Sequence, residues 1–215
     1  MRKRILIATA ITAIVLAVLG AVAWLSPLIK ANKVEVSGNH FTSTEEVLAA
    51  ADIPDGAKLL PLSSKAVAQR VSALPWVAKV SVSKHLPDTV AIEVLEHEAI
   101  GYVPKGDGMH IFDASGTVFM IADDPAGAIR VATKDEAGQQ AAATVLGALD
   151  PMQRPRIQEV EANNPEAITL KLHGGKEIYW GSTDNLRNKV VAMDAALSRE
   201  EQRVDISAAP DIAVR

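Results

Sequence analysis

The stretch from Pro75 to Gly101 reads PWVAKVSVSKHLPDTVAIEVLEHEAIG. Two runs within it, Trp76–Ser83 and Thr89–Glu96, alternate apolar and polar residues. That period of two is typical of strands with one buried face. A turn sequence, His85–Asp88, separates the two runs. The stretch therefore predicts a β-hairpin.

Upstream of this hairpin the chain predicts one strand and two short helices. Residues Asn32–Ser37 alternate, with valines on one face, and predict a strand. Thr42 and Ser43 each stand three residues before one glutamate of the Glu45-Glu46 pair, which is the spacing of a helix-capping box. A second helix is predicted over Ser63–Leu74, with its first serine as N-cap. The order strand, helix, helix, strand, strand predicts a small α+β unit with both helices on one face.

Downstream of the hairpin the chain is richer in strands and contains two predicted helices. One helix is predicted over Asp135–Leu149, and the other is predicted to be capped by Thr183 or Asp184 and to run through Leu197. The predicted strands are short and separated by turn residues. They are Ala99–Val103, Met109–Phe112, Thr117–Ile121, Ala128–Val131, Ile157–Ala162, Ala167–Leu172, Glu177–Trp180, Arg203–Ser207 and Asp211–Val214.

An apolar segment precedes all of these elements. Residues 5–29 carry no charged side chain, and the 21 residues Ile5–Leu25 are almost wholly apolar. A helix of that length spans about 32 Å, enough to cross a bilayer core. The basic run Arg2-Lys3-Arg4 favours an N-terminus in the cytoplasm. A cleaved signal peptide is the alternative, because Ala21-Val22-Ala23 resembles a cleavage site, although the apolar run is longer than usual for one. In both cases residues 30–215 lie outside the cytoplasm.

The predicted fold class is α+β, in four consecutive parts. They are a cytoplasmic tail at 1–4, a transmembrane helix at 5–29, the small α+β unit at 30–97 and the strand-rich unit at 98–215, whose last strand lies at the edge of its sheet.

Composition excludes several functions. The chain has 215 residues and a formal net charge of −4, which argues against binding to a nucleic-acid backbone. Only 4% of its residues are aromatic, so stacking platforms for single-stranded nucleic acid are not expected. It contains no cysteine, which excludes disulfides, thiolate zinc sites and a cysteine nucleophile.

The sequence contains few candidate catalytic or metal-binding patterns. None of the five histidines forms a metal-binding pair on a predicted helix. Glu96-His97-Glu98 alternates on a strand, so the histidine faces away from both carboxylates. Asp123-Asp124, Asp113 and Gly116 are read as turn residues. We therefore predict no enzyme, no metal and no cofactor, although a catalytic triad assembled only in space stays open.

Without catalytic groups, binding is the expected activity. A strand at the margin of a sheet exposes unpaired N–H and C=O groups, and a partner chain can add a strand there. The candidate is Asp205–Val214, since Pro210 disfavours a central strand.

Several short elements match one known family. They are the hairpin run Pro75–Gly101, VEVSGN at Val34–Asn39, FDASGTVF at Phe112–Phe119, Trp180-Gly181, Lys189 and Val204-Asp205-Ile206. On these residues the chain resembles, over essentially its whole length, the FtsQ/DivIB family of cell-division proteins. The resemblance implies that the small α+β unit is a polypeptide-transport-associated (POTRA) domain and the strand-rich unit the family's β domain.

The resemblance also implies a partner. In the family the last strand, with the helix before it, receives a segment of FtsB, a small single-span coiled-coil protein that acts with FtsL. Carried over by position, the partner-binding residues are Asp205, Ile206, Ser207, Ile212, Val214, Trp180 and Ser182. Ser182 replaces a charged contact of the family. Ordinary packing is the alternative for each of these residues, above all for Trp180.

The POTRA domain of the family recruits the protein to the division site. Lys84, Leu86 and Pro87 on its hairpin are the candidates for that contact, and Trp76 is expected to be a buried anchor beside the helix Ser63–Leu74. The resemblance thus implies a single-pass inner-membrane scaffold at the septum that binds FtsB and FtsL and helps position the septal wall synthase. The rivals are a POTRA-type transport or assembly module with many weak clients and a membrane-anchored cell-wall hydrolase.

Overall fold

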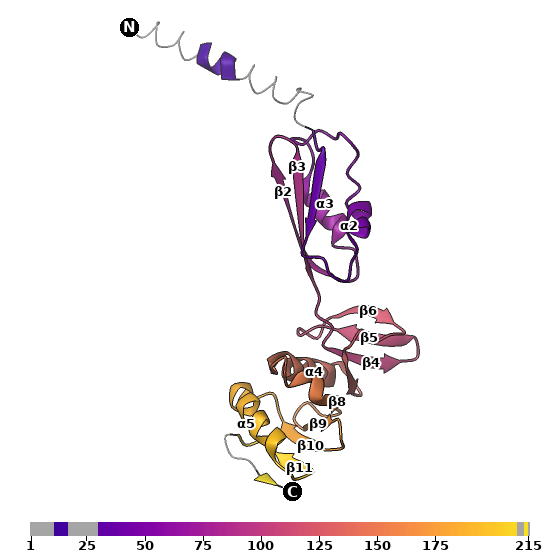
Figure 1. Ribbon diagram of the computed structural model, residues 1–215, viewed down its shortest axis with the longest axis vertical. Helices are drawn as coiled ribbons and strands as arrows, with labels where there is room; N and C mark the ends of the chain where they lie inside the picture. The colour runs from indigo at the N-terminus through magenta and orange to yellow at the C-terminus, as the bar shows by residue number, and fades with distance from the viewer. Residues whose placement is uncertain (1–10, 17–29, 210–212, 215) are drawn as a thin grey trace, which may run out of the picture. The chain divides into compact units, whose positions relative to one another are not determined.

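A computed structural model describes residues 11–16, 30–209 and 213–214. Residues 11–16 are helical, and no helix within the described ranges is long and apolar enough to cross a membrane. The rest of the transmembrane helix predicted over 5–29 lies outside the described residues, as does the predicted tail at 1–4. The chain forms two compact units that divide between Glu96 and His97 (Figure 1).

The first unit contains a three-stranded sheet in the order β1-β3-β2. Strand β3 is central, parallel to β1 and antiparallel to β2. Two helices connect the first strand to the hairpin, as the sequence predicts. The elements are β1 (Lys33–Ser37), α2 (Thr44–Ala51), α3 (Ser64–Val71), β2 (Val77–His85) and β3 (Thr89–Glu96).

Serine caps begin both helices of this unit. The Ser43 hydroxyl accepts from the Glu46 backbone N–H at 3.2 Å, and the Glu46 carboxylate accepts from the Ser43 N–H at 2.8 Å. These two bonds form the predicted capping box, and the backbone donor of Ser43 holds the pKa of Glu46 below its usual value. The Ser63 hydroxyl caps α3 in the same way. The far ends of the helices are joined because the Arg70 guanidinium donates to the Ala51 carbonyl at 3.1 Å.

The core of this unit lies between the helices and one face of the sheet. Val90, Ile92 and Val94 of β3 are at most 3% exposed, as their alternation predicts. The prediction for Trp76 is wrong, because its ring is partly exposed and stacks on Phe41 with centroids 4.2 Å apart. An irregularity in the β2 register between Val77 and Lys79 reverses the alternation, so that Val77 takes the buried place.

The second unit is built on one nine-stranded sheet in the order β12-β11-β10-β9-β8-β7-β4-β5-β6. Its strands are β4 (Gly101–Lys105), β5 (Gly108–Phe112), β6 (Val118–Ala122), β7 (Ile129–Ala132), β8 (Ile157–Glu161), β9 (Ile168–Leu172), β10 (Glu177–Gly181), β11 (Arg203–Asp205) and β12 (Ala213–Val214). Its helices are α4 (Glu136–Ala148), the short 3₁₀ helix η1 (Arg154–Arg156) and α5 (Leu186–Ser198). The α+β class is confirmed.

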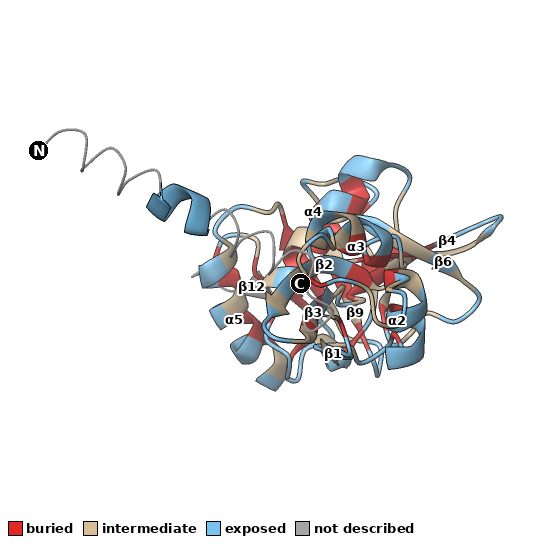
Figure 2. Cartoon of the chain, turned by 90° about the horizontal axis from the view of Figure 1, so that it is seen from above, coloured by how far each residue is buried: buried red, intermediate tan, exposed pale blue. Residues whose placement is uncertain are grey.

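Both long helices pack on the sheet of the second unit and share one core with it. The largest buried side chain, Trp180, lies in this core with Phe112, Leu146 and Met193. Figure 2 shows in red the buried residues of α4 and α5. Asp135 caps α4, since its carboxylate accepts from the Gly138 N–H at 2.9 Å. The cap predicted for α5 is wrong. That helix begins after Asn185, whose backbone is left-handed and whose side chain makes no capping bond.

Candidate partner-binding edge

The C-terminal strands form one margin of the nine-stranded sheet. Strand β11 runs parallel to β10, with Val204 opposite Ile178. Strand β12 is antiparallel to β11, with Val214 opposite Val204 and Ala213 opposite Asp205. Because β12 ends the strand order, it has one strand neighbour among the described residues.

The chain turns away from β11 through a compact hydrogen-bonded loop. The Asp205 carboxylate accepts from the Ser207 backbone N–H at 3.0 Å and from its hydroxyl at 2.7 Å. The Ile206 N–H continues the bonding to β10, since it donates to the Tyr179 carbonyl at 3.0 Å. These bonds fix the direction in which the chain leaves for β12.

The buried members of the predicted set support this edge from inside. Trp180 and Ile206 are fully buried and belong to the core, and Asp205 is 7% exposed. Ordinary core packing, the alternative to partner binding, therefore describes the side chains of Trp180 and Ile206, which have no exposed surface.

The other predicted partner-binding residues differ in how they are placed. Ser207 and Ser182 are partly exposed. Val214 pairs through its backbone with Val204. Ile212 lies outside the described residues.

Gly181, at the end of β10, makes the closest approach to the edge loop. Its φ is +77°, and a β-carbon built on it would lie 2.7 Å from the Ser207 β-carbon. Glycine is required there both by the backbone conformation and by the space.

A buried lysine that the sequence did not single out as a site residue lies behind this loop. Lys189 of α5 is 1% exposed, and its ammonium donates to the Ser182 carbonyl at 2.8 Å. Burial lowers the pKa of Lys189, and the charges of Asp184 and Glu166 partly oppose that shift. The position of Lys189 in the sequence could have indicated that it is buried. It stands three residues after Leu186 and four before Met193, on the apolar face of the helix.

The face of the sheet opposite the core carries alternating charges. Glu159 of β8 bonds to Lys171 at 3.0 Å and to Arg130 at 3.3 Å. Near the margin, Arg203 bonds to Glu177 at 3.1 Å. That last pair lines a shallow groove of about 330 Å³ beside β11, together with Thr169, Tyr179, Val204 and Asp205.

The hairpin between β2 and β3 contains the other predicted site. The Lys84 ammonium donates to the Leu60 carbonyl at 3.0 Å, so it is held against its own unit. Leu86 is 65% exposed and Pro87 is also exposed.

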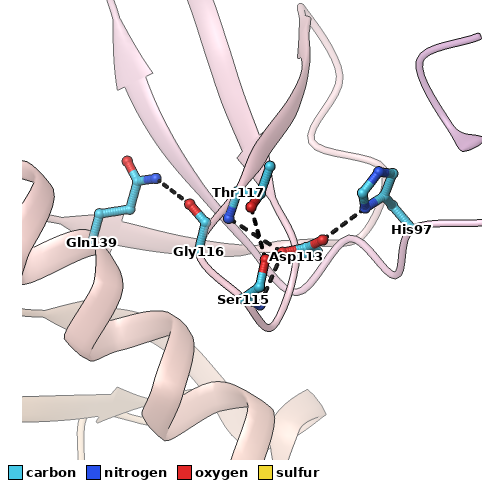
Figure 3. A network of polar contacts seen from close by, with 6 residues as sticks. All are labelled: His97, Asp113, Ser115, Gly116, Thr117 and Gln139. Carbon is cyan, nitrogen blue, oxygen red and sulfur yellow. Dashed lines mark hydrogen bonds and ion pairs between the residues drawn. The ribbon is translucent and has the colours of Figure 1, made fainter. Parts of the chain in front are cut away.

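A serine, an aspartate and a histidine meet at the turn between β5 and β6 (Figure 3). The Asp113 carboxylate lies between the other two, at 2.5 Å from the Ser115 hydroxyl and 2.7 Å from His97 Nδ1. In a hydrolytic triad the histidine contacts the serine, so this order leaves the hydroxyl without a base. Burial raises the pKa of Asp113, but its hydrogen bonds outweigh that effect and lower it. The cluster is a turn, as the sequence predicts for Asp113 and Gly116.

No group of three or more potential metal-ligating side chains occurs in the described ranges.

Two family models cover most of the chain. The model for the FtsQ-type POTRA domain matches residues 29–97. The model for the C-terminal part of the cell division protein FtsQ/DivIB matches residues 101–207.

The chain is also similar to curated and solved proteins. It is 34% identical to the cell division protein FtsQ of Corynebacterium glutamicum, over 100% of this chain and 99% of that protein. It is 30% identical to FtsQ of Mycolicibacterium smegmatis, over 97% of this chain, and spans 64% of that longer relative. The extracytoplasmic domain of DivIB from Geobacillus stearothermophilus matches 49% of this chain and 97% of its own, with 17% identity and a TM-score of 0.37, too slight a likeness to carry an argument.

The two family models and the full-length similarity agree on one family. The chain belongs to the FtsQ/DivIB family, whose members are non-enzymatic scaffolds of bacterial cell division.

Proposed function

We propose that this chain is a single-pass inner-membrane scaffold of the division complex that binds FtsB-type and FtsL-type partners outside the cytoplasm by strand addition. The observation that carries the proposal is the position of β12 at the margin of the sheet, with one strand neighbour in the described ranges. An extended partner segment would continue the sheet there through main-chain hydrogen bonds. By this contact the scaffold helps to position septal peptidoglycan synthesis.

The surroundings of β12 supply the means of specificity. Strand addition gains affinity from the backbone and selectivity from pockets that take alternate side chains. The groove beside β11 is such a pocket, and the Arg203–Glu177 pair at its rim offers one charge of each sign to a polar partner side chain. Gly181 allows β10 to approach Ser207 in the loop before β12, and Lys189 bonds to the Ser182 carbonyl next to that glycine.

The membrane anchor rests on the apolar run and on the family. Residues 5–29 are free of charge, and the similarity to the Corynebacterium glutamicum protein extends over this segment as over the rest of the chain. A scaffold held at the membrane presents its sheet edge to partners that are themselves single-span proteins.

The hairpin tip carries the proposed contact that recruits the protein to the division site. Leu86 and Pro87 are exposed, whereas the Lys84 ammonium bonds within its own unit. We therefore assign the recruiting contact to Leu86 and Pro87, with Lys84 supporting the base of the hairpin.

Hydrogen exchange of the full chain in lipid nanodiscs tests the proposal. On addition of the FtsB–FtsL complex we expect slower exchange over residues 203–214 and unchanged exchange over β6, the opposite margin of the same sheet. Slowing confined to the first unit would favour the transport-module alternative and contradict strand addition at β12. Unchanged exchange throughout, at partner concentrations that saturate co-purification, would also contradict it.

A further inference from the structure

The backbone is fixed to the first unit from Lys30 onward. Lys30 forms an isolated antiparallel bridge with Lys58. The Ala31 N–H donates to the Ala57 carbonyl at 2.7 Å, and Ala31 itself is 5% exposed. The chain therefore enters the unit at one defined place, without a free linker between Lys30 and the fold.

The turn between β2 and β3 lies at the same end of the unit, beside this point of entry (Figure 1). The two are joined because the Asn32 N–H donates to the Asp88 carbonyl at 3.0 Å. Leu86 in this turn is 65% exposed, and Pro87 is exposed as well. An apolar tip therefore stands next to the place where the chain enters.

The proposed membrane anchor ends where this unit begins. The uncharged run ends at Ile29, and Lys30 is the first charged residue after it. A lysine that borders a spanning segment places its ammonium among the lipid headgroups. Even if the span ended at Leu25, a fully extended chain would place Lys30 at most about 18 Å beyond it. The end of the unit that contains Lys30 is therefore confined to the neighbourhood of the membrane surface.

The charges at this end favour a phospholipid surface. Segments 30–35, 55–61 and 84–88 together carry four lysines and three carboxylates, although the chain as a whole has a net charge of −4. Lys33 is paired with Glu35, and the Lys84 ammonium donates to the Leu60 carbonyl. Lys58 is exposed. Exposed lysines are attracted to anionic headgroups, and an apolar side chain beside them gains by burial at the acyl boundary.

We propose that this end of the unit rests on the extracytoplasmic face of the membrane. Leu86 and Pro87 lie at the boundary of the acyl chains, and the ammonium groups of Lys30 and Lys58 lie at lipid phosphates. The inference rests on the proposed membrane anchor. It also limits the proposed recruiting contact to partners that reach the tip at the membrane surface.

Quenching by spin-labelled lipids tests the contact. The sequence contains no cysteine, so an apolar fluorophore can be attached at Leu86→Cys or at Leu95→Cys alone. The full chain would be reconstituted in vesicles that contain phosphatidylglycerol and a lipid labelled near the top of its acyl chains. Leu95 is the matched control, since it is 62% exposed in the same unit but stands about 20 Å along β3 from Thr89. We expect strong quenching at Leu86 and none at Leu95, which would lie beyond the headgroup layer of about 5–8 Å.

The outcomes separate the contact from the anchor. Equal quenching at Leu86 and Leu95 would show that the unit lies flat on the membrane, and no quenching at Leu86 would leave the tip in water. Either result overturns the inference. Flotation of the chain with the vesicles reports the anchor independently. A chain that floats without quenching at Leu86 removes the inference and leaves the proposed scaffold, whereas a chain that does not float removes the anchor and the inference together.

Lysine substitution tests the role of the headgroups. We expect Lys58→Gln to lower the ratio of membrane-bound to free tip, obtained from the quenching at Leu86→Cys, roughly fivefold. The matched control is Lys79→Gln, an exposed lysine opposite Leu95 at the far end of β2, which should leave the ratio unchanged. The effect of Lys58→Gln should disappear in vesicles made only of zwitterionic lipid. Equal effects of the two substitutions, or none from Lys58→Gln, would overturn the lipid contact of Lys58.

Discussion

Replacing Gly181 by alanine should damage the second unit more than the same change at the other end of β10. Gly181 has a φ of +77°, and an alanine β-carbon there would meet the Ser207 β-carbon at 2.7 Å. Gly174, in the turn before β10, has a φ of +94° but nothing within 4 Å of the new atom. The two substitutions share the backbone penalty and differ in the contact, so their difference isolates the contact.

The magnitudes follow from the geometry. A left-handed backbone costs an alanine about 1–2 kcal/mol relative to glycine. Forcing an extra methyl group into a packed site adds about 1–3 kcal/mol. We therefore expect Gly174→Ala to lower the free energy of unfolding of the second unit by about 1 kcal/mol, from the backbone term alone. Gly181→Ala should lower it by about 3 kcal/mol, because both terms act.

Urea unfolding monitored by tryptophan fluorescence measures the difference. The chain has three tryptophans, and only Trp180 lies in the second unit. A Trp24→Phe, Trp76→Phe background in detergent therefore reports the unfolding of that unit. Equal losses for the two variants would refute the inferred contact between β10 and the Ser207 loop. A smaller loss for Gly181→Ala would refute it more strongly.

Three further outcomes are expected. Glu96 accepts from the His40, Phe41 and Thr42 N–H groups at 2.8–2.9 Å, and although burial raises its pKa these donors lower it overall. The ionised Glu96 therefore stabilises the first unit at neutral pH, and this stabilisation is lost on acidification. Glu96→Gln should lower the free energy of unfolding of the first unit by about 2 kcal/mol at pH 7 and weaken the fall of that free energy below about pH 5, both measured by Trp76 fluorescence. Burial lowers the pKa of Lys189, so the second unit should gain stability as pH rises toward about 10, and Lys189→Met should abolish that gain in urea titrations at several pH values. Leu86→Ala should change the unfolding free energy by less than about 0.5 kcal/mol yet reduce septal localisation of a fluorescent fusion, because this side chain is exposed.

Local signals in the sequence predict most elements of the fold. The capping box at Ser43 and Glu46 and the alternation of β3 need only neighbouring residues, and both are confirmed. The prediction that Trp76 is buried is wrong because the register shift in β2 changes which residues face the core. The alternation of apolar and polar residues does not indicate such a shift. The predicted cap of α5 is wrong because the cap is Asn185, whose backbone is left-handed and whose side chain makes no capping hydrogen bond.

The pairing of strands that are distant in sequence could not be predicted from the sequence. The parallel pairing of β4 with β7 joins β4–β6 to the other strands of one sheet, although β5 and β6 separate the two partners in sequence. The same limit applies to the site. The edge position of the last strand could be predicted from the sequence. The burial of Ile206 and Lys189 could not, because it depends on packing between β10, β11 and α5.

Photo-crosslinking in living cells tests strand addition at β12 most directly. A small diazirine amino acid would be placed at the partly exposed Ser207, at the buried Ile206 and at Ile121 on the opposite margin. We predict that Ser207 gives a dominant adduct with a small single-span coiled-coil protein, and that Ile206 and Ile121 do not give it. Absence of that adduct from Ser207 in a folded, abundant protein, or its appearance from Ile121, would contradict partner binding at the β12 edge.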